Sequence, residues 1–158
     1  MTPPSSCSRR AFAVESALVG RGRYADAVAR LDAWIAANPK DKEMGWALNN
    51  RCWARGLWNH DLAAAEQDCD AALRLRPDDP AILDSRGLVE LRQGSYQAAL
   101  ADYSAALRRQ PKQAWSLLCR GLAERALGET ARSRADVAAA TLIAPGLMGR
   151  AKALDLAP

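Results

Sequence analysis

The stretch that decides the fold is PAILDSRGLVELRQGSYQAALADYSAALRRQPKQ, residues 80–113. Two segments with small and apolar residues at helical spacing flank the turn at Gly94. Pro111 ends the second segment, because proline cannot continue a helix. The stretch therefore predicts two helices joined by a short turn.

This pattern recurs every 34 residues along the chain. The interval separates the members of three sets: Asp68, Asp102 and Asp136; Ala72, Ala106 and Ala140; and Pro77, Pro111 and Pro145. A period of 34 is typical of helix-turn-helix arrays, in which each repeat must bury an apolar face against its neighbour. The chain is therefore predicted to be all-α and repetitive.

At these positions the sequence resembles the tetratricopeptide repeat family. Counted from Pro80, Leu83, Gly87 and Glu90 stand where the family pattern has Trp, Gly and Tyr, so two of the three positions depart from it. The remaining matches in this repeat are Gly94, Tyr96, Ala99, Tyr103, Ala106 and Pro111. The fourth repeat matches through Leu117, Gly121, Gly128, Ser133, Val137, Ala140 and Pro145, and the second through Leu48, Cys52, Leu62, Ala65, Cys69, Ala72 and Pro77.

The resemblance implies a right-handed α-α superhelix of about four repeats and a C-terminal capping helix. We expect a disordered tail at residues 1–8, a solenoid at 9–145 and a capping helix with a tail at 146–158. The repeats are expected at 8–41, 45–79, 80–113 and 114–145, and the first is degenerate because Trp34 replaces a small residue. The expected helices are 9–20, 24–37, 42–58, 61–76, 80–93, 96–110, 114–127 and 130–143. Gly87 is expected to face Ala99, and Gly121 to face Ser133, where paired helices approach closely.

An arginine and an aspartate recur in phase with the repeats. Each arginine precedes the small residue of a first helix, and each aspartate follows 16 or 17 positions later: Arg51 with Asp68, Arg86 with Asp102, and Arg120 with Asp136. We expect these residues to form structural pairs between the two helices of a repeat. The first repeat has Val14 and Arg30 at the nearest positions and is expected to lack the pair.

Two cysteines of the second repeat, Cys52 and Cys69, fall on opposite helices near their crossing. A disulfide is one reading, and two buried thiols are the other. The patterns RCW and DCDAAL resemble those of exported bacterial tetratricopeptide repeat proteins, and this resemblance strengthens the disulfide reading but leaves both readings open. A disulfide would imply an oxidising compartment. No secretory signal is evident, so the compartment stays open: cytoplasmic as the sequence stands, periplasmic or exported if Met1 is not the natural start.

Composition argues against several classes of function. The net charge of +4 is spread over 22 basic and 18 acidic residues without a basic stripe, so nucleic acid is not an expected partner. No run approaches the ~20 apolar residues of a membrane span. His60 is the single histidine, and neither Cys7 nor Cys119 has a second metal ligand at suitable spacing. We therefore expect no catalysis, no metal and no cofactor.

In the tetratricopeptide repeat family the first helices line a concave face that binds ligands. The residues that this resemblance assigns to partner binding are Trp46, Asn49, Asn50, Trp53, Asp84, Ser85, Leu88, Leu91, Arg92, Trp115, Leu118, Leu122 and Arg125, with Cys119 on the same inner surface. The groove lysines of the family's carboxylate clamp are missing. We therefore expect an apolar peptide or an amphipathic helix as the ligand. Alternatively, the tryptophans fill seams between repeats.

Two functions remain open. One is a non-enzymatic module that binds a protein or peptide in its groove, and the other is a structural or self-association domain, possibly a fragment of a larger protein. The chain is expected to be a monomer or a weak homo-oligomer.

Overall fold

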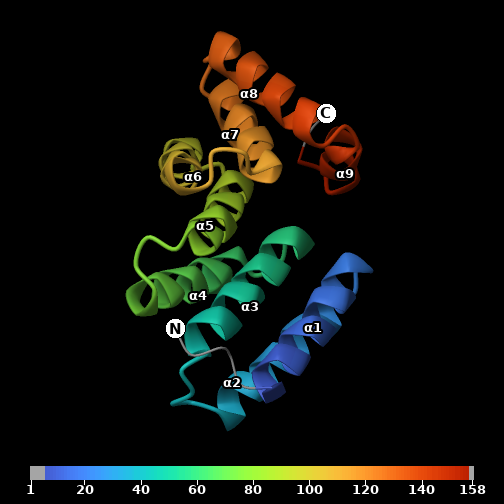
Figure 1. Cartoon of the computed structure of the whole chain (residues 1–158), viewed down its shortest axis with the longest axis vertical. Coiled ribbons are helices and arrows are strands. Elements are labelled where there is room, and N and C mark those ends of the chain that lie inside the picture. Colours follow the sequence, from blue (N-terminus) through green and yellow to red (C-terminus); the bar gives the residue numbers. More distant parts are fainter. Residues whose placement is uncertain (1–5, 157–158) are drawn as a thin grey trace. The chain divides into compact units, whose positions relative to one another are not determined.

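The computed structural model describes residues 6–156, with side chains from Phe12 onward, and this part of the chain contains nine α-helices and no strand (Figure 1). The helices are α1 (Ser6–Gly20), α2 (Tyr24–Ala37), α3 (Met44–Trp58), α4 (Leu62–Leu75), α5 (Pro80–Gln93), α6 (Tyr96–Arg109), α7 (Ala114–Ala126), α8 (Thr130–Ile143) and α9 (Leu147–Ala153). The all-α class and the helical-repeat fold predicted from the sequence are confirmed.

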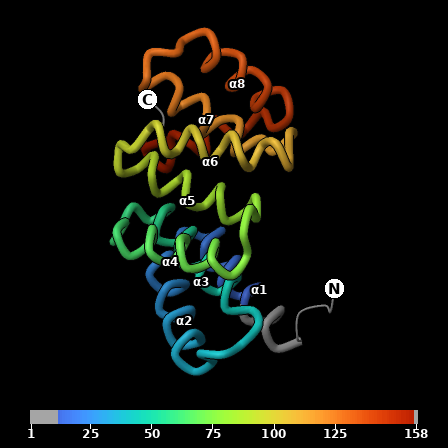
Figure 2. Tube along the Cα trace, turned by 90° about the vertical axis from the view of Figure 1, so that its left-hand side faces the viewer, coloured from blue at the N-terminus to red at the C-terminus, as the bar shows by residue number. Residues whose placement is uncertain are grey.

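The chain divides into two compact units. The N-terminal unit, Met1–Pro77, contains α1 to α4, and the C-terminal unit, Asp78–Pro158, contains α5 to α9. Within each unit, every helix packs against the next helix in the sequence (Figure 2). In both units a first helix also contacts the first helix of the following repeat, α1 with α3 and α5 with α7. The N-terminal unit therefore holds the first two repeats, and the C-terminal unit holds the last two and α9.

The helix bounds follow the sequence expectation closely. From α2 to α8, each end lies within two residues of its predicted position. The differences are at the ends of the chain, where α1 begins at Ser6 and α9 is shorter than expected. Most of the predicted tail, residues 1–5, lies outside the described residues.

Residues in the left-handed conformation end the first helix of each repeat. Gly22, Gly94 and Gly128 have φ between 72° and 83°. In the second repeat Asn59 takes this role, with a φ of 56°, and its backbone N–H is bonded to the carbonyl groups of Arg55 and Gly56. Asparagine tolerates this region better than most residues, which explains why the turn forms without glycine.

The small residues of the first helices face larger partners than expected. A Cβ atom added at Gly87 would lie 3.0 Å from the ring of Tyr103, so Tyr103, and not Ala99, is its nearest neighbour. At Gly121 it would lie 3.0 Å from Val137 and 3.1 Å from the carbonyl oxygen of Ser133. Tyr103 and Val137 occupy the same position in successive repeats, so a contact that recurs along the array requires a small residue on the first helix.

The helix α9 packs on the last repeat. Ala151 is fully buried in a cluster with Leu107, Leu117, Leu118 and Ala140, and Leu147, Met148 and Leu156 pack around it. These contacts cover apolar side chains of α7 and α8.

Candidate functional site

The second repeat contains a network of ion pairs around Asp68. Nε and Nη2 of Arg51 donate to the two carboxylate oxygens of Asp68 over 2.7 and 2.6 Å. Nη1 of Arg55 donates to the same carboxylate over 2.7 Å, and Nη1 of Arg51 donates to Asp32 of α2 over 2.6 Å. These charged hydrogen bonds join three helices, and the bond to Asp68 raises the pKa of Arg51 above its ordinary value.

The third and fourth repeats contain the same bidentate geometry. In the third, Arg86 donates from Nε and Nη2 to Asp102 over 2.6 and 2.9 Å. In the fourth, the same atoms of Arg120 donate to Asp136 over 2.6 and 2.9 Å. The structure thus brings together all three arginine–aspartate pairs that the sequence periodicity singled out.

The first repeat has an ion pair that sequence reasoning missed. Val14 is indeed apolar, but the next residue, Glu15, accepts a hydrogen bond of 3.0 Å from Nε of Arg30. The acid now stands on the first helix and the arginine on the second, so the polarity is reversed. The expectation that this repeat lacks the arginine–aspartate pair is therefore confirmed, and a different ion pair, whose acid lies one position after the arginine position of the other repeats, joins its two helices.

Cys52 and Cys69 form a disulfide between α3 and α4, with 5.7 Å between their α-carbons. Both residues are fully buried at the crossing of the two helices. The bond therefore closes the helical hairpin of the second repeat covalently, next to the Asp68 network. Cys119 is a buried free thiol of the C-terminal unit.

In the N-terminal unit, three of the predicted partner-binding residues share one side of α3. Trp46, Asn50 and Trp53 lie within about 60° of one another around the helix axis. All three are partly exposed, and the guanidinium of Arg76 lies 4.2 Å from the centre of the Trp46 ring. Asn49 is buried, and its Oδ1 has no hydrogen-bond partner among the described residues. We refer to Trp46, Asn50 and Trp53 as the α3 face.

In the C-terminal unit, most of the predicted partner-binding residues are buried. Leu88 is fully buried and Leu118 is 1% exposed. These side chains fill the interior and offer a ligand little surface, as do the other buried members of the predicted set: Asp84, Ser85, Leu91, Trp115 and Leu122. Arg92 and Arg125 keep exposed surface.

The segment around α9 covers part of this predicted surface. The guanidinium of Arg150 lies 5.2 Å from the ring centre of Trp115, and Nη2 of Arg92 donates to the carbonyl oxygen of Leu154 over 2.6 Å. The capping segment thus contacts two of the residues that the resemblance assigned to ligand binding. Trp115 itself is 8% exposed, so it offers a partner little surface in this arrangement.

A polar group inside the C-terminal unit has a shifted pKa. Asp84 of α5 accepts a hydrogen bond from the hydroxyl group of Ser116 of α7. Burial raises the pKa of Asp84 to about 6, although the hydrogen bond from Ser116 opposes this shift. Burial also raises the pKa of Tyr103 and that of Cys119. Asp84 is 9% exposed, and Tyr103 and Cys119 are fully buried, so these three side chains belong to the interior.

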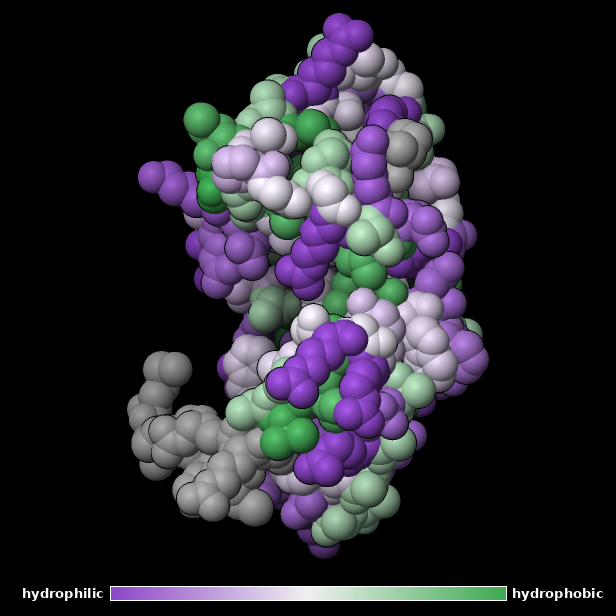
Figure 3. All heavy atoms as spheres, turned by 90° about the vertical axis from the view of Figure 1, so that its right-hand side faces the viewer, coloured by the Kyte–Doolittle hydropathy of each residue, from purple (hydrophilic) through white to green (hydrophobic). Residues whose placement is uncertain are grey.

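On the face drawn in Figure 3, hydrophobic side chains form small separate areas between charged ones. Among the described residues, no group of His, Cys, Asp and Glu side chains could hold a metal ion. None of the described helices is both long and apolar enough to cross a membrane.

Comparisons with known proteins agree with the fold. A family model described as tetratricopeptide repeat matches residues 53–114 and 85–147. No curated protein sequence matches the chain. Two solved structures of MamA are similar: the 41-end form from Desulfovibrio magneticus RS-1 has a TM-score of 0.68 and an RS-1 double mutant has 0.67. Each is 21% identical, and the similarity covers 89% of this chain and 77% of the solved MamA chain.

A tetratricopeptide repeat protein from Parabacteroides merdae is also similar, with a TM-score of 0.66 and 21% identity. The similarity covers 87% of this chain and 53% of that protein, so this chain spans about half its length. At this level of identity the structural matches establish the fold alone.

Proposed function

Because the chain belongs to the tetratricopeptide repeat family, whose members are generally non-enzymatic protein-interaction modules, we propose that it binds a peptide or a helix of a partner protein through the α3 face. The observation that carries this proposal is the clustering of two partly exposed tryptophans and one amide on a single side of α3. Tryptophan is enriched among the residues that dominate binding energy at protein interfaces.

The chemistry of the α3 face favours an apolar segment as the ligand. The indole rings of Trp46 and Trp53 provide apolar area with few rotatable bonds, which keeps the entropic cost of binding low. The amide of Asn50 between them can both donate to and accept from a peptide backbone. Such a surface suits a peptide that places apolar side chains on either side of an exposed peptide group.

A rigid base supports the α3 face. On the other sides of α3, the Cys52–Cys69 disulfide and the bonds from Arg51 to Asp68 tie this helix to α4. A surface held in place before binding loses less conformational entropy when the partner arrives.

A structural or self-association role is the second candidate, and one observation favours it. Leu142 is 86% exposed and Ile143 is 47% exposed at the end of α8. Adjacent exposed aliphatic side chains of this kind can mediate contacts between copies. Light scattering over a range of protein concentrations separates the two functions, because only self-association predicts a mass that increases with concentration.

The binding proposal can be tested with selected peptides in place of the natural partner. Peptides selected from a random display library against the chain would be synthesised, and their affinities measured by calorimetry for three variants. Asn50→Ala and Trp53→Ala should each weaken binding about tenfold or more, which corresponds to about 1.4 kcal/mol.

Trp58→Ala provides the matched control. This tryptophan is on the same helix and is 37% exposed, but it lies about 120° around the axis from Trp46. It should leave the affinity unchanged. Selected peptides that bind equally well to all three variants would exclude the α3 face as the binding site.

A further inference from the structure

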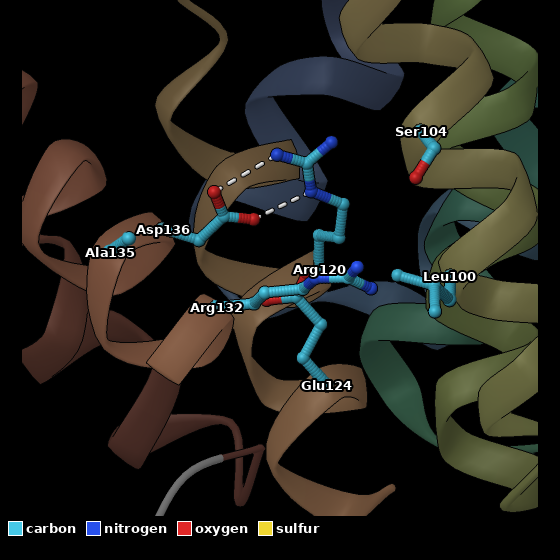
Figure 4. Close-up of a pocket in the computed structure, with 7 residues that line it drawn as sticks. All are labelled: Leu100, Ser104, Arg120, Glu124, Arg132, Ala135 and Asp136. Atoms are coloured by element: carbon cyan, nitrogen blue, oxygen red, sulfur yellow. Dashed lines mark hydrogen bonds and ion pairs between the residues drawn. The ribbon is translucent and has the colours of Figure 1, made fainter. Parts of the chain in front are cut away.

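A pocket lies between α6, α7 and α8 of the C-terminal unit (Figure 4). Its volume is about 380 Å³, and it is lined by Leu100, Ser104, Arg120, Glu124, Arg132, Ala135 and Asp136. In Figure 4, Nε and one terminal nitrogen of Arg120 face Asp136, and the other terminal nitrogen points away from it. Since Nη2 is the nitrogen that bonds Asp136, the one that points away is Nη1, and no described residue accepts a hydrogen bond from it.

The second repeat shows what the equivalent nitrogen does when it has a partner. Arg51 binds Asp68 through the same two atoms, Nε and Nη2, and its Nη1 donates to Asp32 over 2.6 Å. Asp32 is the ninth residue of α2. In this repeat, a carboxylate from the preceding helix therefore accepts a hydrogen bond from the guanidinium nitrogen that does not bind Asp68.

In the fourth repeat this carboxylate is missing. The ninth residue of the preceding helix, α6, is Ser104, which lines the pocket. Replacement of an aspartate by the shorter serine removes the negative charge and leaves space beside Arg120. We propose that the pocket binds a carboxylate side chain, from an Asp or a Glu of a partner polypeptide, in the place that Asp32 takes in the second repeat.

A second guanidinium supports this assignment. Arg132 lines the pocket and extends from α8 toward Leu100 of α6 (Figure 4). Its single partner among the described residues is Glu129, at 2.7 Å, and its side chain is 73% exposed. It can therefore turn toward a bound carboxylate, much as Arg55 approaches Asp32 to 3.9 Å in the second repeat.

Glu124 makes the binding dependent on pH. It stands where the second repeat has Arg55, it is 5% exposed, and its Oε2 has no hydrogen-bond partner among the described residues. Burial first, and then Asp136 and Glu129, raise the pKa of Glu124, whereas Arg120 and Arg132 lower it. The α6 side of the pocket adds no charge, because it contributes Leu100 and Ser104.

The sign of this dependence follows from linkage. A bound carboxylate repels the ionised form of Glu124 and raises its pKa further, so binding takes up a proton. Affinity should therefore increase as the pH falls toward the pKa of Glu124. The protonated carboxyl group can also donate a hydrogen bond to the ligand.

The pocket is distinct from the surface that the family resemblance assigned to ligands. At 100° per residue, Arg120 and Glu124 lie about 140° and 180° around α7 from Trp115. A ligand in this pocket therefore approaches the side of α7 opposite to Trp115 and Leu122. The proposal is also independent of the α3 face, which is in the other unit.

The direct test is a titration of protein labelled with ¹⁵N-arginine, observed by NMR. The probe is N-acetyl-glutamate N-methylamide, whose single charge is the side-chain carboxylate, and the matched neutral probe is N-acetyl-glutamine N-methylamide. The Nε–H signal of Arg120 should shift in a saturable way with the first probe and stay in place with the second. In Glu124→Gln the affinity near pH 7 should increase and lose its dependence on pH. Acetate that binds as tightly as the glutamate probe would overturn the assignment to a polypeptide side chain.

Variants at Ser104 provide a test that needs no ligand. Ser104→Asp recreates Asp32 and should raise the melting temperature by about 2–4 °C, which corresponds to about 1 kcal/mol, and abolish the response to the probe. Ser104→Asn introduces a side chain of the same shape as aspartate but without the charge, and it should not raise the melting temperature. Equal melting temperatures for the two variants, or no shift of the Arg120 signal in the native protein, would overturn the proposal.

Discussion

Replacement of Asp68 by asparagine should destabilise the protein more than the same change at Asp136. Asp68 accepts three hydrogen bonds from Arg51 and Arg55, whose side chains are 17% and 13% exposed. Asp136 accepts two bonds from Arg120 alone, which is 24% exposed. The Asp68 variant therefore removes the buried counter-charge that two guanidinium groups share, although Asp32 and Asp61 remain near them, and the Asp136 variant removes that of one.

The magnitudes follow from the burial of these groups. Loss of one partner of a buried ion pair costs about 3–5 kcal/mol, and a hydrogen bond to a charged group contributes about 1.5–3 kcal/mol. Arg51 would still retain Asp32, which is 48% exposed, so we expect about 4 kcal/mol for Asp68→Asn. For Asp136→Asn we expect about 2 kcal/mol, because one moderately exposed arginine can regain water.

Urea unfolding followed by circular dichroism would measure these differences. The control is Asp26→Asn, which breaks the Arg23–Asp26 pair, where both side chains are more than half exposed. It should change the free energy of unfolding by less than about 0.5 kcal/mol. If Asp68→Asn costs no more than this control, the network does not stabilise the second repeat and the reasoning from burial fails.

Three further predictions concern the interior. The pKa of Asp84 is raised from 3.8 to about 6, so between these pH values the native state binds more protons than the unfolded state. The free energy of unfolding should therefore fall as the pH rises through this window. In urea titrations, Asp84→Asn should remove this pH dependence and add up to about 3 kcal/mol near pH 7. Reduction of the Cys52–Cys69 bond, which spans 17 residues, should lower the free energy of unfolding by about 3 kcal/mol, and a variant with both cysteines replaced by alanine should not respond to reductant. Gly121→Ala should lower the free energy of unfolding by about 1–3 kcal/mol, because its Cβ would lie 3.0 Å from Val137 and 3.1 Å from a backbone oxygen. Gly149→Ala has open space around it and should raise the free energy of unfolding by up to about 1 kcal/mol. Thermal melts that rank these two variants in the opposite order would contradict the packing.

The sequence predicted the helices well because each boundary has a local chemical cause. Glycine or asparagine in the left-handed conformation ends the first helices, and these residues are visible in the sequence. The arginine–aspartate pairs were also predictable, because the same two residue types recur at the same separation in three repeats. A periodic array repeats each local signal, which makes the register far clearer than in a single helical hairpin.

Burial was harder to predict. Helical periodicity shows which residues share one side of a helix, but it does not show how many neighbouring helices cover that side. Leu88 and Leu118 were predicted to bind a ligand, yet both are almost completely buried. The cover over Trp115 depends on α9, a short helix interrupted by Gly149, whose position is set by tertiary contacts and not by its own propensity.

A residue that departs from the pattern of the other repeats says more about a specific ligand site than a residue that matches it. Asp102 and Asp136 recur because each repeat needs its two helices tied together, so their recurrence indicates structure and not a specific ligand. Ser104 and Glu124 depart from Asp32 and Arg55, and the departures remove a carboxylate and a cation from one network while its central arginine stays in place. The Arg120 side chain is 24% exposed, so water can solvate Nη1 in the free chain. A carboxylate from another molecule would replace that water with a charge-assisted hydrogen bond, and this is the physical reason to search for the ligand at this pocket.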